Sequence, residues 1–124
     1  MRIDVPDGDV ADRITILELK LHNLSNPRQL AHVQSELDGL HAAWAAASEV
    51  MLDAVPGLDR LRVVNSELWD VEDALRALEA AQDFGPRFVA LARSVYTLND
   101  ERARLKAGIN DYTGSRLREQ KSYA

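Results

Sequence analysis

Arg102 occupies a position where the sequence pattern calls for an apolar residue, and a guanidinium group there could do chemistry. The pattern alternates steps of three and four residues and runs through Phe88, Leu91, Val95, Leu98, Arg102, Leu105 and Ile109. A charged group in such a stripe is costly to bury unless hydrogen-bonded partners surround it. Arg102 therefore needs either an acidic partner within the protein or an anionic ligand.

Polar and aromatic residues are expected around Arg102 if neighbouring helices pair antiparallel about short turns. They are Asn99 on the same helix, Trp69 and Glu72 on the preceding helix, and Trp44 and His41 on the helix before that. Two interpretations remain open. In the first, Glu72 or an aspartate of the first helix neutralises Arg102 while a tryptophan stacks on its plane. In the second, Arg102 binds a carboxylate or phosphate between tryptophan walls, with Arg13 and Lys20 as further cations.

Metal and cofactor chemistry have little support in the sequence. The histidines are His22, His32 and His41, and only Asp38 with His41 has the acid–histidine spacing of a di-metal helical bundle, which needs that unit twice. The chain contains no glycine-rich phosphate loop, nucleophile elbow or paired-histidine zinc helix. We predict no metal, no cofactor and no catalytic residue, and the question of enzymatic activity stays open, with the balance against it.

Composition restricts the function classes further. The 124 residues suffice for one domain with its own core, and the net charge of −5 disfavours nucleic acid and anionic membranes as partners. There is no cysteine, which removes thiol catalysis and fits a reducing compartment. No window approaches the ~18 apolar residues of a membrane span, and the acidic N-terminal stretch lacks the apolar run of a signal peptide. The expected location is the cytoplasm.

Long helices must position these residues. Two more stripes share the spacing of the Arg102 stripe: Leu30, Val33, Leu37, Leu40, Trp44, Ala47, Met51; and Leu61, Val64, Leu68, Val71, Leu75, Leu78. Proline, glycine and asparagine clusters predict helices over residues 7–23, 27–53, 58–82 and 86–112. The predicted fold is an all-α antiparallel bundle of three long helices with coiled-coil spacing plus one shorter N-terminal helix.

The ends of the chain lead to two further expectations. Gly114 is a candidate left-handed cap, so we divide the chain into a helical bundle domain, residues 1–114, and a polar tail, residues 115–124, which is either docked or free. The short first helix leaves part of the bundle groove open, as a pocket or an oligomer interface. We expect the exposed apolar surface at residues 42–51 and 58–61.

Several stretches resemble a family of short uncharacterised bacterial proteins known only as a domain of unknown function. The stretches are DRITILELKL from Asp12, VNSELWDVED from Val64, DFGPRF from Asp83, LARSVY from Leu91, NDER from Asn99 and KSY from Lys121. The resemblance implies a helical single-domain bacterial protein and supplies no activity. It also implies that Arg13, Lys20, Asn65, Trp69, Asp70, Asp73, Arg93, Asn99 and Arg102 belong to the family pattern.

The prediction that follows is a non-catalytic binding or assembly module. Its expected partner is a second copy, giving a homodimer, or another protein. The alternative is a small all-α enzyme or receptor for an anionic metabolite that uses Arg102, Arg13 and Lys20 as cations. A closed pocket around Arg102 would favour the alternative, whereas a filled core would favour the module.

Overall fold

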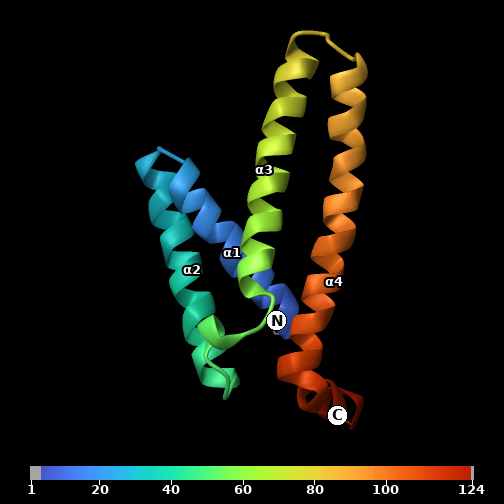
Figure 1. Cartoon of the computed structure of the whole chain (residues 1–124). Coiled ribbons are helices and arrows are strands. Elements are labelled where there is room, and N and C mark those ends of the chain that lie inside the picture. The colour runs from blue at the N-terminus through green and yellow to red at the C-terminus, as the bar shows by residue number, and fades with distance from the viewer. Residues whose placement is uncertain (1–3, 124) are drawn as a thin grey trace.

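The protein is all-α (Figure 1). The computed structural model describes the backbone of residues 4–123 and the side chains of residues 4–114. The elements are α1 (Asp7–Asn23), α2 (Pro27–Ala47), the one-turn 3₁₀ helix η1 (Leu52–Ala54), α3 (Leu58–Ala80) and α4 (Pro86–Tyr123). The predicted fold class is therefore confirmed.

The helices form two hairpins of unequal length. Figure 1 shows the α1–α2 hairpin packed against the base of the longer α3–α4 hairpin, whose far end extends beyond it. Helix α1 lies at the centre and packs against α2, α3 and α4, whereas α2 has no extensive contact with α3. The predicted antiparallel pairing of α2 with α3 is wrong, because the segment between them is long enough for α1 to take that place.

Helix α2 begins as the sequence predicts. The side chain of Asn26 accepts hydrogen bonds from the backbone N–H groups of Arg28 and Gln29, at 2.9 and 3.2 Å, and Pro27 occupies the first helical position. An asparagine cap satisfies N–H groups that have no partner within the helix, and proline has no N–H group to satisfy. This corner fixes the turn that folds α2 back along α1.

We expect Asn26→Ala to lower the free energy of unfolding by about 1 kcal/mol, since alanine cannot accept these hydrogen bonds. Asn26→Ser keeps a capping oxygen and should recover most of the loss. Urea unfolding followed by circular dichroism measures both changes. Equal stability of the alanine and serine variants would contradict a capping role.

Helix α2 ends at Ala47, six residues before the predicted end at 53. Beyond it, Trp44 Nε1 donates a hydrogen bond to the Val50 carbonyl oxygen at 2.9 Å, and Ser48 Oγ bonds both the N–H and the carbonyl of Val50. These side-chain bonds give the backbone partners outside a helix. The apolar periodicity continues through this loop but does not show where the helix stops.

The core forms where α1 meets the other helices. Its fully buried apolar side chains are Ala11, Ile14, Leu17, Leu58, Leu61, Val64 and Ile109. Helix α1 buries two faces: one carries Ile14 and Leu17, and the other carries Gly8, Ala11, Asp12 and Thr15. A helix with neighbours on several sides needs this second face, and its small residues permit close approach.

Gly8 shows how close that approach is. Its N–H group donates a hydrogen bond to Asn110 Oδ1 at 2.6 Å. A Cβ atom added to Gly8 would lie 2.9 Å from the carbonyl carbon of Lys106 and closer still to the carbonyl oxygen. The α1 backbone therefore rests directly on α4, and no larger residue fits at this crossing.

Gly114 does not end α4. Its φ is −136° and its ψ 15°, so the helix kinks at this residue and its backbone continues helical to Tyr123. The predicted left-handed cap is wrong, because the glycine accommodates a bend with negative φ. The side chains of residues 115–124 lie outside the described part of the structure, so the question of a docked tail stays a prediction.

Candidate functional site

A buried polar cluster joins three helices at the level of Arg102. We define it as Asp12 and Thr15 from α1, Asn65 from α3 and Arg102 from α4. The first three residues are at most 5% exposed, and the Arg102 side chain is 29% exposed. Polar groups at such depth are stable only with complete hydrogen bonding.

Asp12 is the centre of the cluster. Arg102 donates from Nε to Asp12 Oδ1 at 2.8 Å and from Nη2 to Oδ2 at 2.5 Å, which is a bidentate pair. Asn65 Nδ2 donates to Asp12 Oδ1 at 2.9 Å and to Thr15 Oγ1 at 2.8 Å, and Thr15 donates to the Asp12 carbonyl oxygen. Every charge and amide proton at the centre of the cluster thus has a partner within the chain.

The electrostatics keep this pair ionised. Burial alone raises the pKa of Asp12, but hydrogen bonds from Arg102 and Asn65, with the positive charge of Arg102, outweigh it and lower the pKa overall. The hydrogen bond to Asp12 and its negative charge raise the pKa of Arg102. A carboxylate with a lowered pKa is a poor proton donor or acceptor at neutral pH. The cluster is therefore suited to holding α1, α3 and α4 together.

An aspartate of the first helix neutralises Arg102, as one interpretation of the sequence predicts. Glu72, the alternative acid in that interpretation, does not pair with Arg102. The Glu72 side chain is 50% exposed and lies 3.9 Å from Arg76 of its own helix. It adds only its charge to the environment of Arg102. The Asp12 carboxylate takes the bidentate position because α1, rather than α2, lies in the groove.

A cavity of about 230 Å³ adjoins the polar cluster. Its lining consists of Ile16 and Leu19 from α1, Asn65, Leu68, Trp69 and Glu72 from α3, and Asn99 and Arg102 from α4. Four of the predicted ligand-site residues, Arg102, Asn99, Trp69 and Glu72, are thus brought together. Arg102 Nη1 faces Asn99 Oδ1 at 3.5 Å, which is a weak contact, and this edge of the guanidinium borders the cavity.

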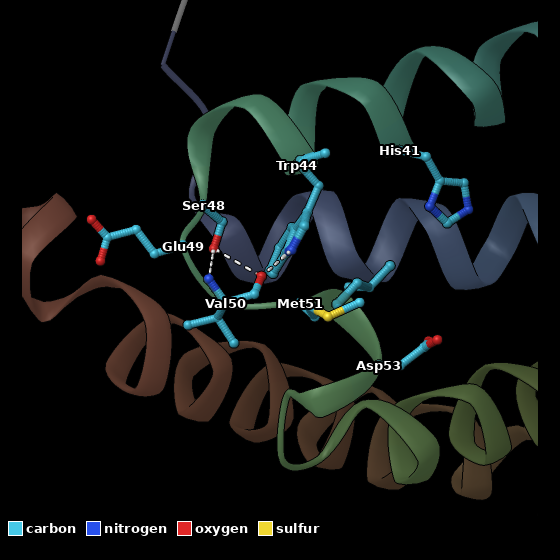
Figure 2. Close-up of a pocket in the computed structure, with 9 residues that line it drawn as sticks. His41, Trp44, Ser48, Glu49, Val50, Met51 and Asp53 are labelled. Atoms are coloured by element: carbon cyan, nitrogen blue, oxygen red, sulfur yellow. Dashed lines mark hydrogen bonds between the residues drawn. The ribbon is translucent and has the colours of Figure 1, made fainter.

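The remaining predicted site residues lie elsewhere. Trp44 and His41 line a second cavity, of about 320 Å³, at the α2 C-terminus (Figure 2). Figure 2 shows the hydrogen bond from the Trp44 ring to the Val50 carbonyl oxygen. The predicted placement of Trp44 and His41 beside Arg102 is wrong, because α2 packs on α1.

The candidate cations are also separated. Arg13 is paired with Glu36 of α2 through Nε at 3.0 Å and Nη2 at 2.8 Å. Lys20 borders an open groove of about 450 Å³ with Arg28 and His32, at the α1–α2 turn. Arg102, Arg13 and Lys20 therefore do not converge on one anion, and two of the three already have carboxylate partners.

The sequence predicts an aspartate of the first helix as a partner of Arg102 but does not identify Asp12. This residue sits on the α1 face Gly8, Ala11, Asp12, Thr15, whose spacing of three, one and three residues marks one side of a helix. Small residues at this spacing indicate a close helix crossing, and an acid among them indicates a cationic partner on the helix opposite. Asn65 could have been found by the same reasoning on α3.

The described part of the chain offers neither a cluster of metal-ligating residues nor a membrane-spanning helix. It contains no group of three or more histidine, cysteine or acidic residues placed to hold a metal ion. It also contains no helix that is long and apolar enough to cross a membrane.

Comparison with known proteins gives a family but no activity. Neither the curated proteins nor the solved structures gave a match to this chain. A family model does match, over residues 1–124, and it is described as a family of unknown function (DUF6165). The resemblance noted in the sequence is confirmed at this level: the chain belongs to the DUF6165 family.

Proposed function

We propose that the protein is a non-catalytic assembly module that forms a homodimer through the far half of the α3–α4 hairpin. We call this part, residues 71–98, the arm. The saturated polar cluster supports a structural rather than a catalytic role for Arg102. The absence of cysteine is compatible with action in the reducing cytoplasm of a bacterial cell.

The observation that carries the proposal is a change in burial along one apolar stripe. At the base of the hairpin, where α1 covers the stripe, Leu61, Val64 and Ile109 are fully buried. On the arm, the same stripe is only half-buried at Val71, Leu75, Leu78, Phe88, Leu91, Val95 and Leu98. No residue from 69 to 108 reaches full burial. Two helices alone cannot enclose such a stripe, whereas four can.

The arm also carries exposed aromatic and aliphatic side chains: Phe84 is 49% exposed, Val89 41% and Tyr96 62%. They lie on the same two helices as the half-buried stripe, and exposed apolar surface beside such a stripe supports a contact with another protein. The surface expected from the sequence lay elsewhere, at residues 42–51 and 58–61. Leu58 and Leu61 are buried against α1, so that part of the expectation is wrong, while Met51 is 77% exposed.

Light scattering during size-exclusion chromatography tests the proposal. At micromolar concentration the mass should be twice 13.8 kDa. Leu75→Glu places a charge in the half-buried stripe and should give a monomer. Val63→Glu changes an exposed aliphatic residue of α3 outside the arm and should leave the dimer intact, with the helix content of both variants checked by circular dichroism.

A monomeric wild-type protein at every accessible concentration would contradict the proposed homodimer. A dimer that survives Leu75→Glu would show that the copies meet through a surface other than the arm.

A further inference from the structure

The tip of the arm exposes an aromatic side chain, and the cavity beside Arg102 is an open space lined partly by apolar side chains. At the tip, Phe84 and Phe88 make an edge-to-face contact with ring centres 5.2 Å apart, yet Phe84 remains half exposed. At the base of the arm, the cavity presents Ile16, Leu19 and Trp69 around an open space. Within one copy the tip is too far from the cavity to fill it, because the 11 residues after Trp69 span about 16 Å of helix.

We propose that the aromatic tip of each copy inserts into the cavity beside Arg102 of a second copy, with the two arms antiparallel. This inference rests on the proposed homodimer and specifies its geometry. The occupant of each cavity is the Phe84 side chain of the other copy.

Symmetry supports this arrangement. In a two-fold dimer, a residue that contacts a second site in the partner receives the same contact in return. The distance from cavity to tip is identical in both copies, so antiparallel arms that seat one tip also seat the other. The contact closes on itself and leaves no further tip to recruit a third copy.

The position of α1 argues against parallel arms. Helix α1 already occupies the groove at the base of α3 and α4, on the side of the cavity. Two arms pointing the same way across this groove would bring both α1 helices into the same space. Antiparallel arms avoid the collision, because each arm lies on the part of the groove that α1 leaves uncovered.

The chemistry of the cavity fits a phenyl ring. A space of about 150 Å³ accepts benzene in an apolar protein interior, so the ~230 Å³ here holds one ring with some room. Trp69 and Leu68 offer apolar and aromatic contacts. The edge of Arg102 that is not bonded to Asp12 can lie over the ring face as a cation–π partner.

A seated tip would add to the apolar surface that the stripe alone can bury. Phe84 is 49% exposed, and Val89 and Tyr96 of the same arm are 41% and 62% exposed. A standard interface buries about 800 Å² per partner, of which somewhat more than half is apolar. A contact that includes the tip therefore draws on more of the exposed apolar surface than a contact through the stripe alone.

Disulfide trapping tests the geometry, because the chain has no cysteine of its own. Two single variants, Phe84→Cys and Leu19→Cys, are mixed at micromolar concentration under mild oxidation. The expected product is a mixed disulfide between the two. Mixing Phe84→Cys with Met51→Cys is the matched control, since Met51 is far more exposed than Leu19 but lies away from the cavity. That mixture should give little product.

Loss of the tip gives a second readout. Phe84→Ala should raise the dimer dissociation constant by at least about tenfold, as expected for an aromatic anchor in a pocket. Tyr112→Ala removes an exposed aromatic residue of α4 outside the arm and should leave the constant unchanged.

The possible outcomes separate the two proposals. A dimeric mass with no mixed disulfide, or with Phe84→Cys linked only to itself, would overturn the antiparallel docking and leave the homodimer standing. A monomeric mass would overturn both.

Discussion

Replacing Arg102 with leucine is expected to destabilise the fold at pH 7 by about 2–3 kcal/mol and to lower the melting temperature by about 10 °C. The substitution leaves Asp12, whose side chain is 6% exposed, as a buried carboxylate without its cation. Breaking a buried pair costs more than the pair contributes, because the remaining charge keeps its desolvation penalty. The partial exposure of the Arg102 side chain, 29%, places the estimate just below the ~3–5 kcal/mol expected when a fully buried pair is broken.

Two control variants separate this effect from simple loss of a salt bridge. Arg60→Leu removes a bidentate pair with Glu101 that also joins α3 to α4, but the Arg60 side chain is 52% exposed, so little change is expected. Glu72→Ala should also change the stability little, since Glu72 is half exposed. A wild-type melting temperature for Arg102→Leu would contradict the structural role of the cluster.

A second substitution should reverse the loss. In the wild-type background, Asp12→Asn removes the negative partner of Arg102 and should destabilise the protein. In the Arg102→Leu background, the same change replaces a stranded charge with a neutral amide whose oxygen can still accept the hydrogen bond from Asn65, so it should stabilise. Opposite signs in the two backgrounds would demonstrate direct coupling between Asp12 and Arg102.

The pH dependence follows from the pKa of Asp12. Because the folded protein lowers this pKa, the contribution of Asp12 is fully present above its unfolded value, near 4, and is lost as the pH falls through the lowered value. Without Arg102, burial raises the pKa instead. The difference in free energy of unfolding between the wild type and Arg102→Leu should therefore become smaller as the pH is lowered. Thermal melts at several pH values measure this difference.

Gly8→Ala is expected to destabilise the protein by about 2 kcal/mol, although alanine is the better helix former by nearly 1 kcal/mol. The added methyl group would meet the backbone of Lys106, which belongs to a helix and cannot turn aside as a side chain could. It would also press on Asn110 Oδ1, which accepts the Gly8 N–H. Helix α1 would have to move away from α4 and weaken the core at Ile109.

Gly39→Ala is the matched control, because a Cβ atom at this position of α2 has no neighbour within 4 Å. It should stabilise by about 0.5–1 kcal/mol through helix propensity alone. Urea unfolding of the two variants should thus give changes of opposite sign. A stabilising effect of Gly8→Ala would show that α1 and α4 do not approach each other as closely as described.

The sequence predicts where the helices begin, because the residues that start a helix act locally. It does not predict where α2 and α4 end. Asn26, Pro27 and Pro86 act within a few residues of themselves, and α1, α2 and α4 begin where such residues predict. The sequence does not predict which helices pack together. An apolar stripe shows which face of a helix is buried but not which helix covers that face. The stripe of α2 could therefore pack against α3 as well as against α1.

In the candidate site, too, residues fixed by a short turn are predictable, whereas residues whose place depends on helix pairing are not. Trp69 and Asn99 lie beside Arg102 because one hairpin with a short turn fixes the position of α3 relative to α4. Trp44 and His41 were misplaced, since their position depends on the pairing of α2. Asp12 is not identified from the sequence because a single acid on an amphipathic helix resembles a surface residue. Only its small neighbours on α1 indicate that another helix packs closely against this face.

The central position of α1 has a consequence for how the fold assembles. The contacts that tie α1 to α4 link residues 90 and 102 positions apart, at Asp12–Arg102 and Gly8–Asn110, whereas each hairpin closes through a turn of a few residues. Loop-closure entropy grows with the logarithm of chain length, and contacts between distant residues slow folding. Each hairpin can therefore form from contacts between residues close in sequence. The two hairpins pack together only when α1 makes its contacts with α4.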